Sequence, residues 1–463
     1  MTVASLMGIA TFFIGVPAVT GALFAYPRLR RPMLILMVFA TCHIKKPFYM
    51  EVFFEAYRGV DRGFGVTIPD LFFFGFFFWL LMGGSGKKLV LWPYNNTLYI
   101  TFIFISVCSL TTSAVAYYGL FTVHKFIRGF VLFWVMVNIV REKEDVQAVI
   151  TGVMAAVIFE GGIVFWDKYV TKAVVNRSVG SFPHPNTLAM YLDLIIPTIL
   201  SLILADGFTK KGNRWAIIAV FAGMLCVIFT KSRASLVIMI GALCLVTAIS
   251  ILMKPTARKI GIVFIGFVLV DMIGVAVAPR IIKRFQTAPK ASEETREYFN
   301  SAAIAMANDY ALGTGINSYS WMLANTEYYW HVYPDKLDTV EDLDAFRESK
   351  HGLSRLGTAH HIYLLFAAET GWIGMWVFIL FLVRFYLRNF VLLLKAYDEY
   401  YQAILLGLFI GFSTLHMQGL LEWIFRQTQV FYLFFVLCGL MVAIGNIMKR
   451  EQYRVNLENK GLQ

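Results

Sequence analysis

The chain has 463 residues, of which 58% are hydrophobic and 15% charged, and its mean hydropathy is +0.66. A soluble domain cannot bury this much apolar surface, so the composition excludes a soluble globular protein and predicts an all-α integral membrane protein. Outer-membrane strands are excluded because they need about ten alternating residues, whereas the apolar runs here are continuous. The net charge of +12 indicates basic cytoplasmic loops and, in part, an anionic ligand, and no separate basic domain points to nucleic acid.

The apolar runs predict about 12 or 13 transmembrane helices and one large extracytoplasmic loop. The predicted spans are residues 5–24, 33–43, 68–82, 97–113, 126–140, 146–165, 187–205, 215–230, 234–253, 260–278, 371–387, 402–417 and 429–447. Basic loops such as YPRLRRP and GGSGKK alternate with less basic ones, which assigns the basic loops to the cytoplasm.

This pattern divides the chain into N-terminal helices (1–278), an extracytoplasmic loop (279–359) and C-terminal helices with a cytoplasmic tail (360–463). The loop is too long for an ordinary connection. Within it, Ser292 is a predicted N-cap for a helix that runs to about Asn308, and the acidic, aromatic residues 327–348 are typical of an ordered lid.

No metal site or cofactor is predicted. The five cysteines occur singly and form no CxxC pair, and the chain lacks credible GxGxxG, Walker A and GxSxG motifs.

Several basic residues lie at predicted outer helix ends, where the topology rule disfavours them. They are Arg128, Arg177, Lys231, Arg233 and Arg426. Guanidinium groups bind phosphate oxygens through paired donors, so an external polyanion such as a lipid-linked phosphate would explain them. The alternative for each is an arginine that snorkels to a lipid headgroup or caps a helix.

Two histidines, His360 and His361, stand where the long polar segment meets a new apolar run, in GTAHHIYLLFAAETGWIG. Imidazole exchanges a proton near neutral pH, so this position suits either catalysis or a simple interfacial role. Glu369 precedes Gly371, and we predict a structural turn there, because glycine lets a short interfacial helix break before the span.

A second loop, before residue 187, contains His184 and Asn186. His184 could line an outer cavity or simply precede the helix, with Asn186 as its N-cap. Ionisable residues are costly inside apolar runs and are often functional there. Those in or near apolar runs are Asp193, Glu160, Asp271 and Glu422.

Three motifs, in this order, resemble the bacterial O-antigen ligase and polymerase superfamily of membrane glycosyltransferases. They are GSFPHPNTLAMYL at 180–192, KSRAS at 231–235 and HHIYLLFAAETGWIG at 360–374. The resemblance extends over about residues 126–447, including ANDYALGTGINSY before the last motif. His361 stands where the family usually has asparagine, and alignment on Tyr363 and Leu364 favours His360 as the family's histidine.

The resemblance implies a metal-independent, inverting glycosyl transfer at the periplasmic face of the inner membrane. The donor would be a glycan on undecaprenyl diphosphate, and the acceptor a hydroxyl of a glycan or lipid, so ligation and polymerisation both fit. Arg233 and Arg128 would hold the diphosphate, and His360 would assist the acceptor hydroxyl. A neutral imidazole is needed for that role, which predicts loss of activity in acid.

Two other functions fit the same composition. A transporter or flippase for a lipid-linked glycan or other anion also needs a basic cavity, but its unusual polar residues would gather at the middle of the membrane. A non-catalytic scaffold for polysaccharide export would tolerate the loss of His360.

Overall fold

The structure, a computed structural model, describes residues 3–43, 49–55, 59–172, 177–264, 266, 290–326, 329 and 357–458. Two regions named above lie outside or mostly outside these residues. They are the predicted span 260–278 with Asp271, described only to residue 264 and at 266, and the predicted lid, of which only residue 329 is described.

Helices dominate the described part of the chain, where nine are long and apolar enough to cross a membrane. These nine are α1 (Val3–Ala25), α5 (Ala116–Ile139), α6 (Lys143–Phe165), α7 (Pro185–Leu204), α8 (Lys210–Thr230), α9 (Arg233–Met253), α15 (Ile362–Lys395), α16 (Glu399–Gly419) and α17 (Thr428–Glu458). Shorter apolar helices are α2 (Arg30–Phe39), α3 (Ile68–Leu81) and α4 (Asn96–Cys108). The prediction of an all-α integral membrane protein is confirmed, and every predicted span except 260–278 overlaps one of these helices.

Helices α7 and α17 form the centre of the bundle. In each, 94% of the most apolar stretch is buried, against 28% in α8 and α9 and 22% in α1, which lie at the rim. Close packing against α16 explains part of this burial, because Gly407 and Gly411 of α16 have no room for a side chain beside the α7 backbone at Thr198 and Leu194. Small residues that let helices approach closely are a common packing device in membranes.

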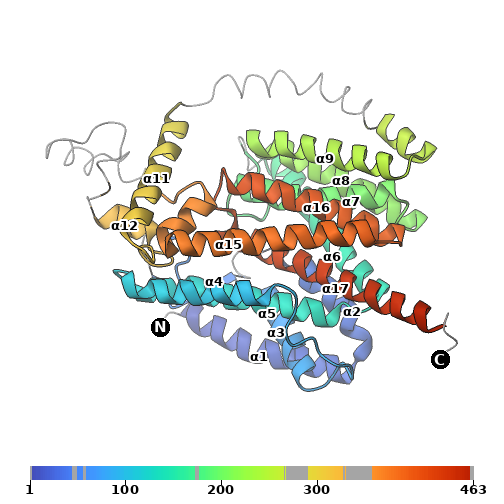
Figure 1. Cartoon of the computed structure of the whole chain (residues 1–463), viewed down its shortest axis with the longest axis horizontal. Helices are drawn as coiled ribbons and strands as arrows, with labels where there is room; N and C mark the ends of the chain where they lie inside the picture. The colour runs from blue at the N-terminus through green and yellow to red at the C-terminus, as the bar shows by residue number, and fades with distance from the viewer. Residues whose placement is uncertain are drawn as a thin grey trace.

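Several of the basic loops that the charge pattern assigned to the cytoplasm lie together at one end of the bundle. Arg30, the first residue of α2, bonds Asp145 at the start of α6 at 2.6 Å, and Lys143 bonds Asp398 before α16 at 2.6 Å. Arg450, near the C-terminus, donates to the carbonyl of Arg141 at 2.8 Å. Figure 1 shows the C-terminus at this end and α11 (Lys290–Asp309) and α12 (Tyr319–Asn325) at the opposite end. The alternation of loops therefore matches the prediction.

Helix α5 begins ten residues earlier than the predicted start at residue 126, and this corrects the placement of Arg128. Arg128 lies in the middle of α5 and not at a helix end. The helix tolerates Lys125 and Arg128 because both cations are paired with carboxylates, Asp61 and Asp70 respectively.

A two-stranded antiparallel sheet, which the sequence did not predict, precedes α3. Strands β1 (Tyr49–Val52) and β2 (Phe64–Thr67) pair Met50 with Val66 and Val52 with Phe64. The Phe64 ring packs edge-on against Phe121 of α5, with ring centroids 5.0 Å apart. The hairpin thereby brings its connecting segment, which contains Asp61, against α5.

Helix α15 breaks at Gly371, where φ is 72° and ψ is 171°. The break and its glycine match the predicted turn. A side chain at Gly371 would collide with the carbonyl oxygen of Ala311. The carbonyls freed by the break are satisfied, since Thr314 N donates to Ala368 O at 2.8 Å and Gly315 N to Glu369 O at 3.1 Å.

The helix predicted within the loop is present as α11. It begins at Lys290, so the prediction of Ser292 as its N-cap is wrong. It packs along α15. Part of the long predicted loop, residues 279–359, is therefore packed against the helix that follows His360 and His361.

Candidate functional site

A cavity of about 600 Å³ opens at the end of the bundle opposite the C-terminus. Four separate parts of the chain form its wall: the loop before α7, the α8–α9 turn, helix α11 and the end of α16. The lining residues are Arg177, Asn186, Lys231, Ser232, Arg233, Ala234, Val237, Ile238, Arg296, Met417, Gln418, Leu420, Leu421 and Glu422.

Positive charge predominates in this cavity. Among the lining residues, all of which the structure describes, four are cations (Arg177, Lys231, Arg233 and Arg296) and one is a carboxylate, Glu422. The surplus of three positive charges suits a ligand with several negative charges. Three of the four cations, Arg177, Lys231 and Arg233, are residues that the sequence singled out.

The KSRAS motif forms the tight turn between α8 and α9. Lys231 adopts a left-handed conformation (φ 53°) that ends α8, and α9 begins two residues later at Arg233. Arg177 is tied to the same turn, because its Nε donates to the carbonyl of Thr230 at 2.8 Å. The N-terminus of the 21-residue helix α9 adds its dipole to the positive charge of the wall.

A buried carboxylate holds the GSFPHPN motif. Glu160 of α6 is fully buried and accepts hydrogen bonds from the backbone N–H of Ser181, at 2.9 Å, and from the Ser181 hydroxyl. Gly180, at φ 58°, has no room for a side chain beside Glu160. The ionisable residue in an apolar run thus fixes the turn that leads into the cavity.

The prediction of Asn186 as the N-cap of α7 is wrong, because His184 occupies that position. The Nδ1 atom of His184 accepts from the backbone N–H of Asn186 at 3.2 Å. Burial and the neighbouring Arg177 lower the pKa of His184. Asn186 instead spans the cavity wall, since it accepts from Arg177 at 2.6 Å and donates to Glu422 at 2.7 Å.

Glu422 connects the cations to His360. Its Oε2 lies 3.0 Å from Nδ1 of His360, and its Oε1 accepts from Arg296 at 3.0 Å. Burial disfavours the ionised carboxyl, but the hydrogen bond and charge of His360 and the charge of Arg296 outweigh it, so the pKa of Glu422 is lowered. A carboxylate on Nδ1 orients the ring and leaves Nε2 as the atom available for proton transfer.

The two neighbouring histidines have different surroundings. The Nδ1 of His361 accepts from the backbone N–H of Leu364 at 3.2 Å, so His361 is the N-cap of α15. Burial lowers its pKa. His360 instead faces Glu422, and its ring is nearly parallel to the Phe299 ring, with centroids 6.5 Å apart. Of the two rings, His360 is thus the one that contacts a residue of the cavity wall, Glu422.

Helix α16 is anchored at the cavity wall by a buried polar group. Gln418 donates to Asp193 of α7 at 2.7 Å and to Ser235 of α9 at 2.9 Å. This contact accounts for Asp193, the second ionisable residue in an apolar run, as a link between three helices.

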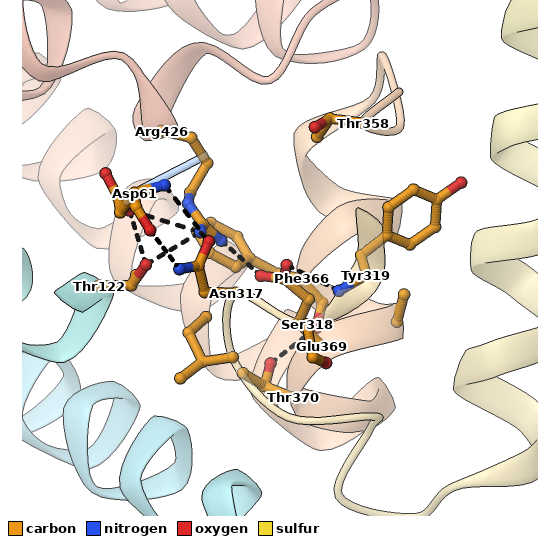
Figure 2. Close-up of polar contacts among 12 residues, drawn as sticks. Asp61, Thr122, Asn317, Ser318, Tyr319, Thr358, Phe366, Glu369, Thr370 and Arg426 are labelled. Carbon is orange, nitrogen blue, oxygen red and sulfur yellow. Dashed lines mark hydrogen bonds and ion pairs between the residues drawn. The ribbon is translucent and has the colours of Figure 1, made fainter. Parts of the chain in front are cut away.

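Several sequence candidates lie outside the cavity lining, namely His184, His360, His361, Arg128, Glu369 and Arg426. Of these, His360 contacts the lining residue Glu422. Arg128 is buried and donates to both carboxylate oxygens of Asp70 at 2.9 Å, which leaves it no free face for a diphosphate. Glu369 is ion-paired with Arg426, whose side chain is 0% exposed (Figure 2). The prediction that Arg426 binds an external polyanion is wrong, because its guanidinium is buried and is already ion-paired inside the protein.

Sequence reasoning missed two members of the site. Glu422 was noted only as an ionisable residue near an apolar run, and Arg296 carried no motif. No group of three or more His, Cys, Asp or Glu side chains suited to a metal ion occurs in the part of the chain that the structure describes.

The family model for O-antigen ligase matches residues 217–379, a segment that contains the α8–α9 turn, Arg296 and His360. No curated protein matches the chain. The GSFPHPN motif and Glu422 lie outside the matched segment, yet they share its cavity. Residues 217–379 are thus similar to the O-antigen ligase family, and the ordered motifs and the helical membrane fold are consistent with this similarity.

Proposed function

We propose that the protein transfers a glycan from a polyprenyl diphosphate, undecaprenyl diphosphate by family resemblance, to an acceptor hydroxyl. The observation that carries this proposal is a cavity with three surplus positive charges whose one lining carboxylate, Glu422, lies 3.0 Å from Nδ1 of His360. Donor diphosphate and acceptor hydroxyl then meet between the α8–α9 turn and the start of α15.

The cavity wall matches both parts of such a donor. Arg177, Lys231 and Arg233 offer charged donors to the diphosphate. Val237, Met417 and Leu420 line the same cavity with 58%, 53% and 53% of their surfaces exposed, which gives an apolar face for a lipid chain.

The reaction needs little more than positioning and charge neutralisation. As the acceptor oxygen bonds to the anomeric carbon, the bond from that carbon to the diphosphate oxygen breaks, and its electron pair leaves with the diphosphate. The cations stabilise the growing negative charge, an effect that is large in a preorganised site. His360 takes the hydroxyl proton as the new bond forms, and Glu422 stabilises the resulting imidazolium.

We infer that no metal ion is needed, since the four cations supply the positive charge that a divalent ion would bring. Transfer should therefore persist in the presence of a chelator. A loss of activity with chelator that magnesium or manganese restores would contradict this part of the proposal.

We place the cavity on the periplasmic side of the inner membrane, because the opposite end carries the basic loops and the C-terminal tail. An impermeant thiol reagent added to intact spheroplasts should label Lys231→Cys and should spare Lys254→Cys at the other end of the bundle. The reverse labelling pattern would overturn this orientation.

The functional experiment uses purified protein, a lipid-diphosphate glycan and candidate acceptors. Wild type should form the transferred glycan, and His360→Ala and Arg233→Ala should each lose most of the activity. If both variants transfer glycan like wild type, the proposed site is wrong. Movement of the intact donor across a vesicle membrane without any new glycosidic bond would favour a flippase instead.

A further inference from the structure

A second polar cluster lies beside the catalytic cavity and centres on Arg426, the last residue of the short helix η5 (Ile424–Arg426). Its guanidinium pairs with Glu369 through Nη1. Its Nη2 donates to Asn317 at 2.8 Å and to Thr122 at 3.0 Å. Figure 2 shows these side chains converging on Arg426 from separate segments of the chain.

The charges of this cluster balance, so it is not a second anion site. Lys125 and Arg426 are its cations, and Asp61 and Glu369 its carboxylates. Burial opposes ionisation of Asp61, but the charges of Lys125 and Arg426 outweigh it and lower the pKa of Asp61. The backbone carbonyl of Arg426 accepts from Lys125 as well, so both the side chain and the main chain of Arg426 are held.

The cluster connects the two segments that carry His360 and Glu422. Glu369 is the last residue but one of the short first part of α15, residues 362–370, which begins directly after the two histidines and stops at the Gly371 break. Arg426 lies four residues after Glu422 in the turn between α16 and α17. The Arg426 N–H donates to Trp423 O at 3.0 Å, and the Glu422 N–H donates to Gln418 O at 2.8 Å, so this turn is compact.

The first part of α15 is therefore attached to this turn at both of its ends. Glu422 contacts His360 at the start, and Arg426 contacts Glu369 at the finish. These two contacts, together with the hydrogen bonds from Thr314 N and Gly315 N to the carbonyls of Ala368 and Glu369, fix the orientation of this short helix. Loss of the Arg426 contact would let the imidazole move relative to the cations of the cavity.

We propose that Arg426, acting through Glu369, is a positioning residue that holds His360 and Glu422 in register for proton transfer. This inference rests on the proposed function, because it assigns a role only if His360 is the base. Arg426 does not contact the substrate in this account. Its loss should therefore lower kcat and leave the KM for the lipid-linked donor nearly unchanged.

The test compares two buried carboxylates that each pair with one arginine inside the bundle. Glu369→Gln removes the charge that holds Arg426, and Asp70→Asn removes the charge that holds Arg128, away from the cavity. We expect Glu369→Gln to lower kcat by up to roughly 100-fold, as small misplacements of catalytic groups do. Asp70→Asn should lower the thermal midpoint without a comparable change in kcat.

A double-mutant cycle separates positioning from general destabilisation. If Glu369 acts through the position of His360, Glu369→Gln combined with His360→Ala should be no slower than His360→Ala alone. Additive losses in kcat, or a kcat for Glu369→Gln equal to wild type, would overturn the inference. Thr122→Val, which keeps all four charges of the cluster, gives a milder variant, and its kcat should fall in the same direction.

His360→Ala separates this inference from the proposed function. If His360→Ala is inactive and Glu369→Gln transfers like wild type, only the positioning role fails. If His360→Ala transfers like wild type, the proposed function fails first.

Discussion

Replacement of Glu422 by glutamine tests the proposed role of this carboxylate beside His360. The substitution keeps the size of the side chain and removes the charge that faces Nδ1 of His360 and Nη2 of Arg296. The amide can still hydrogen-bond the ring, but it no longer stabilises the imidazolium that forms during proton transfer.

The size of the effect follows from the contacts. Glu422 is 7% exposed in its side chain, whereas His360 and Arg296 are 31% and 36% exposed, so water takes over part of the lost interaction. Since a general base contributes about 100- to 10,000-fold in total, we expect Glu422→Gln to lower kcat by about 10- to 100-fold. The cost in folding stability from the pair with Arg296 should be at most about 1 kcal/mol.

The assay measures initial rates of glycan transfer by purified protein at saturating acceptor, with the donor varied to separate kcat from KM. Circular dichroism and a thermal midpoint confirm that the variant is folded. A folded Glu422→Gln protein with wild-type kcat would refute the role of the carboxylate.

Three further outcomes are expected. Arg233→Ala should lower kcat/KM for the donor by about 10- to 100-fold, since a hydrogen bond to a charged group contributes about 1.5–3 kcal/mol, and Arg233→Lys should lie between it and wild type. Gly371→Ala should destabilise the fold by at least about 1–3 kcal/mol, because alanine is strained in the left-handed backbone conformation at this position. The collision of the new side chain with the neighbouring backbone should add to this cost, and a lower thermal midpoint would show both effects. The pKa values of Glu422 and Asp61 are lowered, so their ionised forms stabilise the fold above pH about 4, and this stability is lost as the pH falls further. The thermal midpoint should therefore drop in acid. In Glu422→Gln, which lacks one of the two carboxylates, the drop should be less steep.

Each of these outcomes has a control. A donor kcat/KM for Arg233→Ala equal to wild type would remove that residue from the diphosphate site. Gly241→Ala is the match for Gly371→Ala, because a side chain at Gly241 meets nothing within 4 Å, and it should leave the midpoint nearly unchanged. An identical acid profile for wild type and Glu422→Gln would show that Glu422 is not ionised in the folded protein.

Much of the fold could be predicted because membrane spans are long and apolar, and the loops between them carry a charge signal. The start of α5 could not, because Lys125 and Arg128 lie in the middle of this helix. Their carboxylate partners, Asp61 and Asp70, lie about 60 residues earlier in the chain. Only the folded structure shows that these charges cancel.

The site was predicted only in part, for a related reason. Arg177, Lys231, Arg233 and His360 stand in short motifs or at recognisable helix ends, so their sequence context marks them. Glu422 does not, because its role comes from contacts with residues 62 and 126 positions away. For an isolated charged residue near an apolar run, only the structure shows whether the side chain lines a binding site or packs inside the protein.

The Gly371 break was predictable from local chemistry, but its consequence was not. Glycine allows the positive φ at that point, whereas the close approach of the backbone at Ala311 is a tertiary contact. The break lets Glu369 face Arg426 while the rest of α15 continues as a span.

The most direct test of the central claim measures donor binding and glycan transfer in the same two variants. We expect His360→Ala to bind the lipid-diphosphate donor like wild type without transferring glycan, whereas Arg233→Ala should bind the donor more weakly. Wild-type donor binding by Arg233→Ala together with wild-type transfer by His360→Ala would contradict a shared site for diphosphate and base in this cavity.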